Sequence, residues 1–112
     1  MTALITLESL NDNYHQESYA YNLDDKNCFT YLDEEKMNCE ICVYDDGICL
    51  FRQCPDHLLE LHLADKKYAK IYTDEGFLQF DVKVVDFKKN SDILLMRYIL
   101  NDEERTITIK YY

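Results

Sequence analysis

Residues Lys70–Val84, KIYTDEGFLQFDVKV, carry the clearest fold signal in the sequence. This stretch holds one of only two glycines in the chain, between two runs in which every second residue is apolar. After the glycine, apolar and polar residues alternate strictly, which is the period of a half-buried strand; the apolar positions are Leu78, Phe80, Val82 and Val84. The pattern predicts two antiparallel strands joined by a tight turn, with Gly76 supplying a positive φ.

Turn signals of the same kind recur along the whole chain. Asp and Asn turn a glycine-poor chain because they tolerate left-handed conformations and bond their own backbone. Short alternating segments between evenly spaced turns predict an antiparallel sandwich or barrel. No Gly/Ser-rich linker interrupts the series, so we expect residues 1–112 to form one domain. The turns begin at Asn11, Asp24, Asp33, Asp45, Cys54, Ala64, Thr73, Lys88 and Asn101.

The amino-acid composition limits the kinds of partner that the protein can bind. Lys and Arg total 12 and Asp and Glu total 22, so the net charge is 12 − 22 = −10. An acidic surface repels phosphate backbones, and the chain has no basic stripe. No apolar run approaches the roughly 18 to 20 residues of a spanning helix. We expect no nucleic-acid partner and no membrane association.

The cysteines and the N-terminus indicate the compartment. Five cysteines is an odd number, and MTALITLESLNDNYH has no basic region typical of a signal peptide. We therefore expect a cytoplasmic protein with reduced thiols. Cys39 and Cys42 form a Cys-x-x-Cys spacing, but on a strand they face opposite sides, which argues against a shared metal. If Asp46–Gly47 is a two-residue turn, Cys39 faces Cys54 and the two are able to pair on oxidation.

One segment is ambiguous. The residues from Cys54 to Lys70, CPDHLLELHLADKKYAK, open with Pro and Asp and are rich in Leu, Glu, Ala and Lys, which favours a helix. The leucines at positions 59, 61 and 63 also alternate with other residues, which favours a strand. Secondary-structure propensity alone therefore allows either a helix or a strand for His57 to Ala64.

The C-terminal half resembles the YwiB-like domain, a bacterial family of unknown function. The family motif Tyr-Thr-x-x-Gly before an alternating strand maps onto Tyr72, Thr73 and Gly76, and the resemblance extends from about Phe29 to Tyr111. YLDEE and LFRQ upstream are similar to the family pattern, although the glycine expected soon after LFRQ is missing. The resemblance implies a calycin-like antiparallel barrel, similar in outline to lipocalins, and makes HLLELHLA a strand. It implies no activity.

Arginine is the residue type most suggestive of a site. An arginine that points into a barrel is able to clamp a carboxylate or phosphate with two hydrogen bonds. The alternative is that each arginine extends over the barrel rim with its head in water. All three arginines share a strand face with apolar residues, and Arg52 is the one we expect inside. The candidate ligand-binding set is Arg52, Arg97, Arg105, Glu60 and Tyr72, with Tyr98 as a further hydroxyl partner.

These observations predict an all-β, up-and-down, calycin/lipocalin-like barrel of eight to ten strands. We expect it to bind a small apolar or amphipathic anion as a monomer or weak homodimer, without metal or cofactor. The alternative is a filled-core structural or protein-interaction domain with no small ligand. We expect no enzyme activity, because the sequence shows no recognisable nucleophile–base arrangement. A hydrolase-type site is the less favoured alternative.

Overall fold

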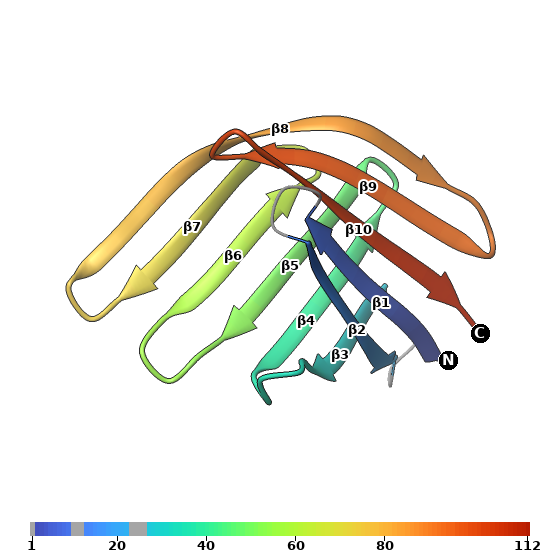
Figure 1. The fold of residues 1–112 in the computed structure, drawn as a ribbon, viewed down its shortest axis with the longest axis horizontal. Coiled ribbons are helices and arrows are strands. Elements are labelled where there is room, and N and C mark those ends of the chain that lie inside the picture. The colour runs from blue at the N-terminus through green and yellow to red at the C-terminus, as the bar shows by residue number, and fades with distance from the viewer. Residues whose placement is uncertain (1, 10–12, 23–26) are drawn as a thin grey trace.

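The computed structural model describes residues 2–9, 13–22 and 27–112, and these residues form an all-β antiparallel barrel (Figure 1). Each strand pairs with the next in sequence, which confirms the predicted up-and-down order. The predicted turns at Asn11 and Asp24 lie outside the described residues. No helix long and apolar enough to cross a membrane is present in the described part of the chain. The strands are β1 (Thr2–Ser9), β2 (Tyr14–Tyr21), β3 (Cys28–Leu32), β4 (Asn38–Tyr44), β5 (Gly47–Gln53), β6 (Leu58–Leu63), β7 (Lys67–Thr73), β8 (Gly76–Lys89), β9 (Ile93–Leu100) and β10 (Glu103–Tyr111).

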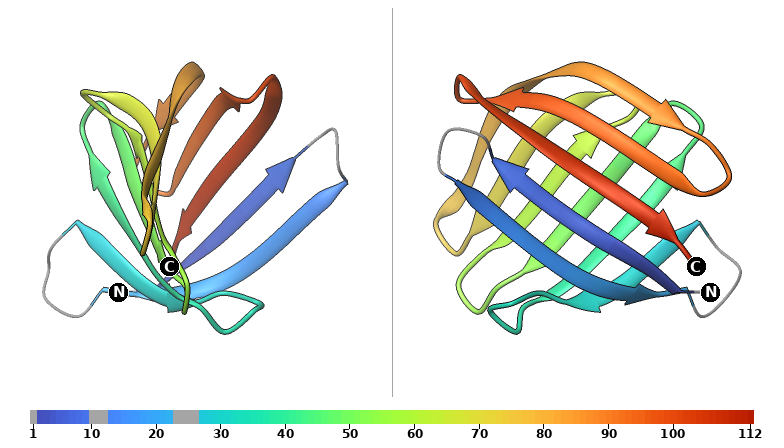
Figure 2. Two further views of the ribbon diagram at one scale, coloured as in Figure 1. Left: turned by 90° about the vertical axis from the view of Figure 1, so that its left-hand side faces the viewer. Right: turned by 45° about the vertical axis from the view of Figure 1, so that its right-hand side comes forward.

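The first and last strands close the barrel. β1 and β10 are antiparallel and in register from Ala3 opposite Tyr111 to Ser9 opposite Arg105, and they lie side by side in Figure 2. The weakest seam joins β2 to β3, where Tyr21 opposite Thr30 is the one residue pair recorded among the described residues. The barrel is therefore held by a full ladder at β1/β10 and is loosely joined at β2/β3.

The interior is apolar at one end and polar at the other. Alternate residues of every strand point inward, and the largest of them are completely buried; they are Ile5, Ile41, Ile48, Leu63, Leu94, Met96, Ile107 and Ile109. Buried polar residues lie further along the same strands, with Ser9 at the end of β1 and Gln16 near the start of β2. Side chains thus fill one half of the barrel, and the polar half holds the candidate site.

The ambiguous segment is a strand. β6 pairs with β5 on one side and β7 on the other, and its buried residues are Leu61 and Leu63. A strand between two neighbours satisfies all its backbone groups and buries alternate leucines, which outweighs the helix propensity of the isolated segment. The strand suggested by the family resemblance is confirmed, and Pro55 remains in the preceding turn.

The β4/β5 hairpin differs from the predicted register. Tyr44 pairs with Gly47, so the turn residues are Asp45 and Asp46 rather than Asp46 and Gly47. The residue numbers of two opposed residues therefore add to 91, whereas the predicted turn at Asp46–Gly47 would make them add to 93. As a result Cys39 faces Arg52 instead of Cys54. A Cβ atom on Gly47 would lie 1.9 Å from the Leu63 carbonyl oxygen. The glycine is required by this close approach of two backbones and not by the turn.

Two further features shape the sheet. Gly76 has a φ of 132°, which confirms the predicted positive φ at the β7/β8 hairpin. β8 carries a register shift between Val84 and Asp86, at an exposed Val85. A bulge of this kind bends a strand and increases its twist, and Figure 1 shows β8 arching across the barrel.

Replacing Gly47 with alanine tests the close approach. The added methyl group would collide with backbone atoms of Leu63 and Ala64, so we expect a loss of about 3 kcal/mol in the free energy of unfolding. Gly76→Ala is the matched control: nothing lies within 4 Å of its added Cβ, so only its positive φ costs stability, about 1 kcal/mol. Urea denaturation of both variants provides the measurement. Equal stability of Gly47→Ala and wild type would contradict the structure.

Candidate functional site

A cavity of about 360 Å³ occupies the polar half of the barrel. This volume is at the lower end of the range for small-molecule pockets, about 300–1,000 Å³. Leucines supply most of its apolar wall, and two arginines, hydroxyl groups and carboxylates supply its polar wall. The apolar lining comprises Leu7, Leu50, Leu59, Leu61 and Leu100, and the polar lining includes Ser9, Tyr14, Gln16, Tyr31, Asp33, Glu35, Arg52, Tyr98, Arg105 and Thr106.

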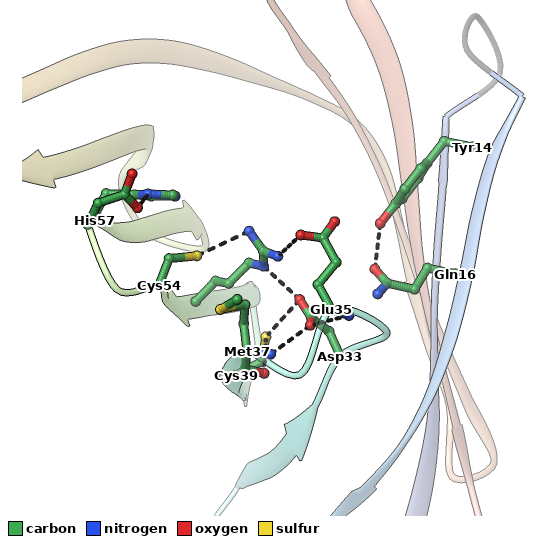
Figure 3. Close-up of polar contacts among 10 residues, drawn as sticks. Tyr14, Gln16, Asp33, Glu35, Met37, Cys39, Cys54 and His57 are labelled. Carbon is green, nitrogen blue, oxygen red and sulfur yellow. Dashed lines mark hydrogen bonds and ion pairs between the residues drawn. The ribbon is translucent and has the colours of Figure 1, made fainter.

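Arg52 is the centre of the polar wall, as the sequence predicted for one interior arginine. Its Nε donates to Asp33 Oδ2 at 2.7 Å and its Nη2 to Glu35 Oε2 at 3.1 Å, contacts drawn in Figure 3. Its Nη1 lies 3.2 Å from Cys54 Sγ. The two carboxylates differ in environment, since the Asp33 side chain is 3% exposed and that of Glu35 is 71% exposed. Asp33 is thus a permanent partner and Glu35 a replaceable one.

The turn that follows β3 holds the Asp33 carboxylate in place. Asp33 Oδ1 accepts hydrogen bonds from the backbone N–H groups of Glu35 and Met37, each at 2.9 Å. An aspartate that bonds its own backbone in this way builds a tight turn. Burial alone would raise the pKa of Asp33, but the Arg52 guanidinium and these N–H donors outweigh it and lower the pKa below its usual 3.8. The carboxylate therefore stays ionised beside Arg52.

Arg105 lies on the opposite wall. Its Nε and Nη2 donate to Glu103 Oε2 at 3.1 and 2.7 Å, and Tyr98 is its cross-strand neighbour. Both interior arginines therefore contact carboxylates before any ligand arrives. A ligand anion would have to compete with an existing partner.

Two buried hydroxyl groups in the cavity wall stand out because they are poorly paired. Ser9 Oγ and the Tyr31 hydroxyl make no well-formed hydrogen bond among the described residues, and the Tyr31 hydroxyl has only the weakly bonding Cys39 thiol beside it. Both residues are more than nine-tenths buried, at 7% and 8% exposure. A buried polar group without a partner costs about 1–3 kcal/mol, and such groups in native proteins usually meet a water, an ion or a ligand. These two hydroxyls are therefore free to contact a molecule in the cavity.

Three residues of the predicted set lie away from the cavity. Arg97 pairs with Glu104 at 2.5 Å, Glu60 contacts His62 at 3.1 Å, and Tyr72 packs beside Phe77. None of them lines the cavity. Strand position explains this for Arg97 and Glu60, since the residues next to each of them in sequence are buried or line the cavity.

The partner of Arg52 was also predicted wrongly. From the residues of the following strand, Glu60 or His62 were the expected partners of Arg52, but these two contact each other, and the structure supplies Asp33, which lies 19 positions earlier in the sequence. The turn sequence DEEKMN directly after an alternating segment was the available signal for a carboxylate at the barrel end.

The cysteine prediction requires a correction too. Cys28 and Cys42 are opposed on β3 and β4 and form a disulfide, whereas we expected five reduced thiols and considered a Cys39–Cys54 pair. Cys39 and Cys54 are free and buried. As predicted, Cys39 and Cys42 face opposite sides of β4, since Cys39 belongs to the interior cluster. The sequence did not predict this disulfide because it depends on how β3 and β4 align, and no short-range pattern fixes that register.

The disulfide also bears on metal binding. The sulfur atoms of Cys28 and Cys42 and a carboxylate oxygen of Glu40 lie within 4.8 Å of one another. Three ligands are one fewer than structural zinc sites usually have. In the disulfide neither sulfur is a thiolate, so this group is able to hold a metal only after reduction.

Replacing Asp33 tests the buried ion pair. Asp33→Asn removes a charged partner of Arg52, and we expect a loss of about 2 kcal/mol in the free energy of unfolding at pH 7. Because the folded-state pKa of Asp33 is lowered, its contribution is present above pH 4 and is lost as the pH falls through the folded pKa. The difference in the free energy of unfolding between wild type and Asp33→Asn should therefore become smaller in acid.

The matched control is Glu35→Gln, whose exposed pair is worth less than about 1 kcal/mol. Urea melts of both variants at pH 7 and pH 2.5 provide the comparison. An Asp33→Asn protein as stable as Glu35→Gln at pH 7 would show that the buried pair contributes nothing.

Comparison with known proteins gives one structural similarity. The sequence matches no protein-family model and no curated protein. Among solved structures, the chain is similar to the crystal structure of the ywiB protein from Bacillus subtilis, with 12% sequence identity and a TM-score of 0.39. The similarity covers 99% of this chain and 90% of that chain.

Proposed function

We propose that the barrel binds a small amphipathic carboxylate in its polar half. The hydroxyls of Ser9 and Tyr31 carry this proposal, since both are buried in the cavity wall and neither makes a well-formed hydrogen bond. The leucines beside them offer an apolar surface for a short hydrocarbon chain. Arg52 offers the head group a charged donor.

Competition at Arg52 decides how the anion binds. Asp33 is buried and fixed by backbone hydrogen bonds, so it stays. Glu35 is exposed, and an exposed ion pair is worth about 0–1 kcal/mol. A ligand carboxylate therefore replaces Glu35 on Nη2 and adds contacts to a buried hydroxyl that Glu35 does not make. The acidic turn keeps the site from filling with inorganic anions, which bring no apolar chain.

The size of the cavity limits the chain length. At about 360 Å³ the site suits a short chain, and octanoate is a suitable probe. Each buried methylene group contributes about 0.8 kcal/mol. Affinity should therefore rise by about tenfold from hexanoate to octanoate and should stop rising once the chain outgrows the cavity.

Calorimetric titration with octanoate at pH 7 tests the proposal. We expect Arg52→Gln to weaken binding by about tenfold, the cost of one charged hydrogen bond. Glu35→Gln should strengthen it by about threefold, because the competitor loses its charge. Arg97→Gln is the matched control, since Arg97 does not line the cavity, and should bind as wild type does. No measurable binding, or equal weakening by Arg52→Gln and Arg97→Gln, would rule out the proposal.

The protein-interaction alternative also has an observation in its favour. A groove of about 700 Å³ runs over the outer wall near the loose β2/β3 seam. Several of its side chains are exposed and apolar, which is typical of contact surfaces; they include Tyr19, Tyr21 and Leu32. If octanoate does not bind and the protein sediments as a dimer, this alternative takes precedence. The calycin-like assignment stays a prediction.

A further inference from the structure

The outer wall of the barrel carries a cysteine, a histidine and a glutamate in contact. Cys49 Sγ lies 3.4 Å from His62 Nδ1, and His62 Nε2 lies 3.1 Å from Glu60 Oε1. Glu60 accepts only, so in the neutral ring Nε2 carries the proton and Nδ1 is the acceptor that faces the thiol. A nucleophile, a base and a group that orients the base are thus present in the right order.

The imidazole is also held by its neighbours. It stacks on Tyr68 with ring centroids 4.4 Å apart, and Phe51 meets it edge-on at 5.7 Å. The His62 and Glu60 side chains are 20% and 17% exposed. Two rings and one carboxylate therefore fix the orientation that presents Nδ1 to the sulfur.

Sheet register places two more sulfur atoms on the same line. Cys49 is opposite Cys42 on β4, and Cys42 is opposite Cys28 on β3. Opposed residues in an antiparallel sheet have Cβ atoms about 4.5–5.5 Å apart on the same face. Cys42 therefore lies between Cys49 and Cys28, so Cys49 reaches Cys42 from the side opposite to Cys28. Displacement at sulfur requires this in-line arrangement.

A surface pocket gives access to the thiol. It has a volume of about 320 Å³, and Cys49 and His62 lie in its wall. Asp46 and Asp65 also line it, against one cation, Lys66. The pocket is thus acidic and favours a cationic reactant.

The thiol requires its base. Burial raises the pKa of Cys49, and Asp46 and Glu60 raise it further, although the backbone N–H of Leu63 opposes them. Cys49 is therefore a protonated thiol at neutral pH and becomes a nucleophile only as a neighbour accepts its proton.

We propose that Cys49 is a nucleophilic thiol, with His62 as its base and Glu60 orienting the ring, that reduces cationic low-molecular-weight disulfides at the expense of the Cys28 and Cys42 thiols. Cys49 Sγ attacks one sulfur of the disulfide, His62 Nδ1 accepts the thiol proton, and the first small thiol leaves with a proton. Cys42 then attacks Cys49 Sγ and releases the second small thiol. Cys28 finally attacks Cys42 and returns Cys49 to the thiol form.

The reaction balances without another reactant. One small disulfide gains two electrons and two protons and becomes two thiols. Cys28 and Cys42 lose them and become the disulfide that the structure shows. Cys49 and His62 end as they began.

A single-turnover reaction of the fully reduced protein with one equivalent of cystamine tests the proposal. Acid quenching, blocking of free thiols with N-ethylmaleimide and peptide mapping follow the formation of the Cys28–Cys42 link. We expect the rate to fall by about a hundredfold in Cys49→Ser and in His62→Gln. His57→Gln is the matched control, because His57 contacts Asp56 outside this pocket, and should react at the wild-type rate.

A trapping variant identifies the entry point. In Cys42→Ser the mixed disulfide cannot be resolved, so the cystamine half should remain on Cys49. Cys39 should stay unmodified, since burial raises its pKa to about 11. A mixed disulfide on Cys28, a Cys49→Ser protein that forms the link at the wild-type rate, or a wild-type protein that does not react would overturn the proposal. Oxidised glutathione, an anion, should react about tenfold more slowly than cystamine, and equal rates would remove the charge preference.

Discussion

Closure of the sheet by β1 and β10 is the constraint on which the other features depend. The two strands come from opposite ends of the chain, yet they pair residue by residue from Ala3 to Ser9. A closed sheet has an inside and an outside, so the alternation of each strand sorts its residues into two separate environments. The same closure brings Ser9 beside Arg105 and completes the cavity wall. Without this ladder there would be an edge-exposed sheet and no cavity.

The inside and the outside then acquire different chemistry. Apolar residues fill one half of the interior. The other half buries polar groups, and each of these destabilises the fold unless it is paired. The Arg52 charge is compensated by Asp33, which its own turn holds in place, whereas the hydroxyls of Ser9 and Tyr31 make no well-formed hydrogen bond. A buried ion pair that is fully hydrogen-bonded is tolerated, but an unpaired hydroxyl is a cost that a ligand or a water removes. The outer wall holds a row of sulfur atoms and an imidazole, well away from that cavity.

Much of the fold follows from local pattern. The alternation in Leu78–Val84 and the positive φ of Gly76 are properties of neighbouring residues, so the sequence suffices to predict them. Alternation with apolar residues also made Arg52 a candidate for the interior, but it did so equally for Arg97, which does not line the cavity. The Asp33 partner, the Cys28–Cys42 disulfide and the Cys49–His62 contact all depend on how separate strands align. The predicted alignment of β4 and β5 was wrong because Gly47 was taken for a turn residue. The structure requires this glycine where its backbone approaches that of Leu63 and Ala64.

Methyl NMR distinguishes a ligand inside the barrel, as proposed, from one on the outer wall. In protein with labelled leucine methyl groups, we expect nuclear Overhauser effects between the octanoate chain and Leu59 and Leu61, which line the cavity. Leu58, adjacent in sequence, lines the outer groove instead and should show none. Effects to Leu58 and Leu32 without effects to Leu59 or Leu61 would place octanoate on the outer wall and rule out binding inside the barrel.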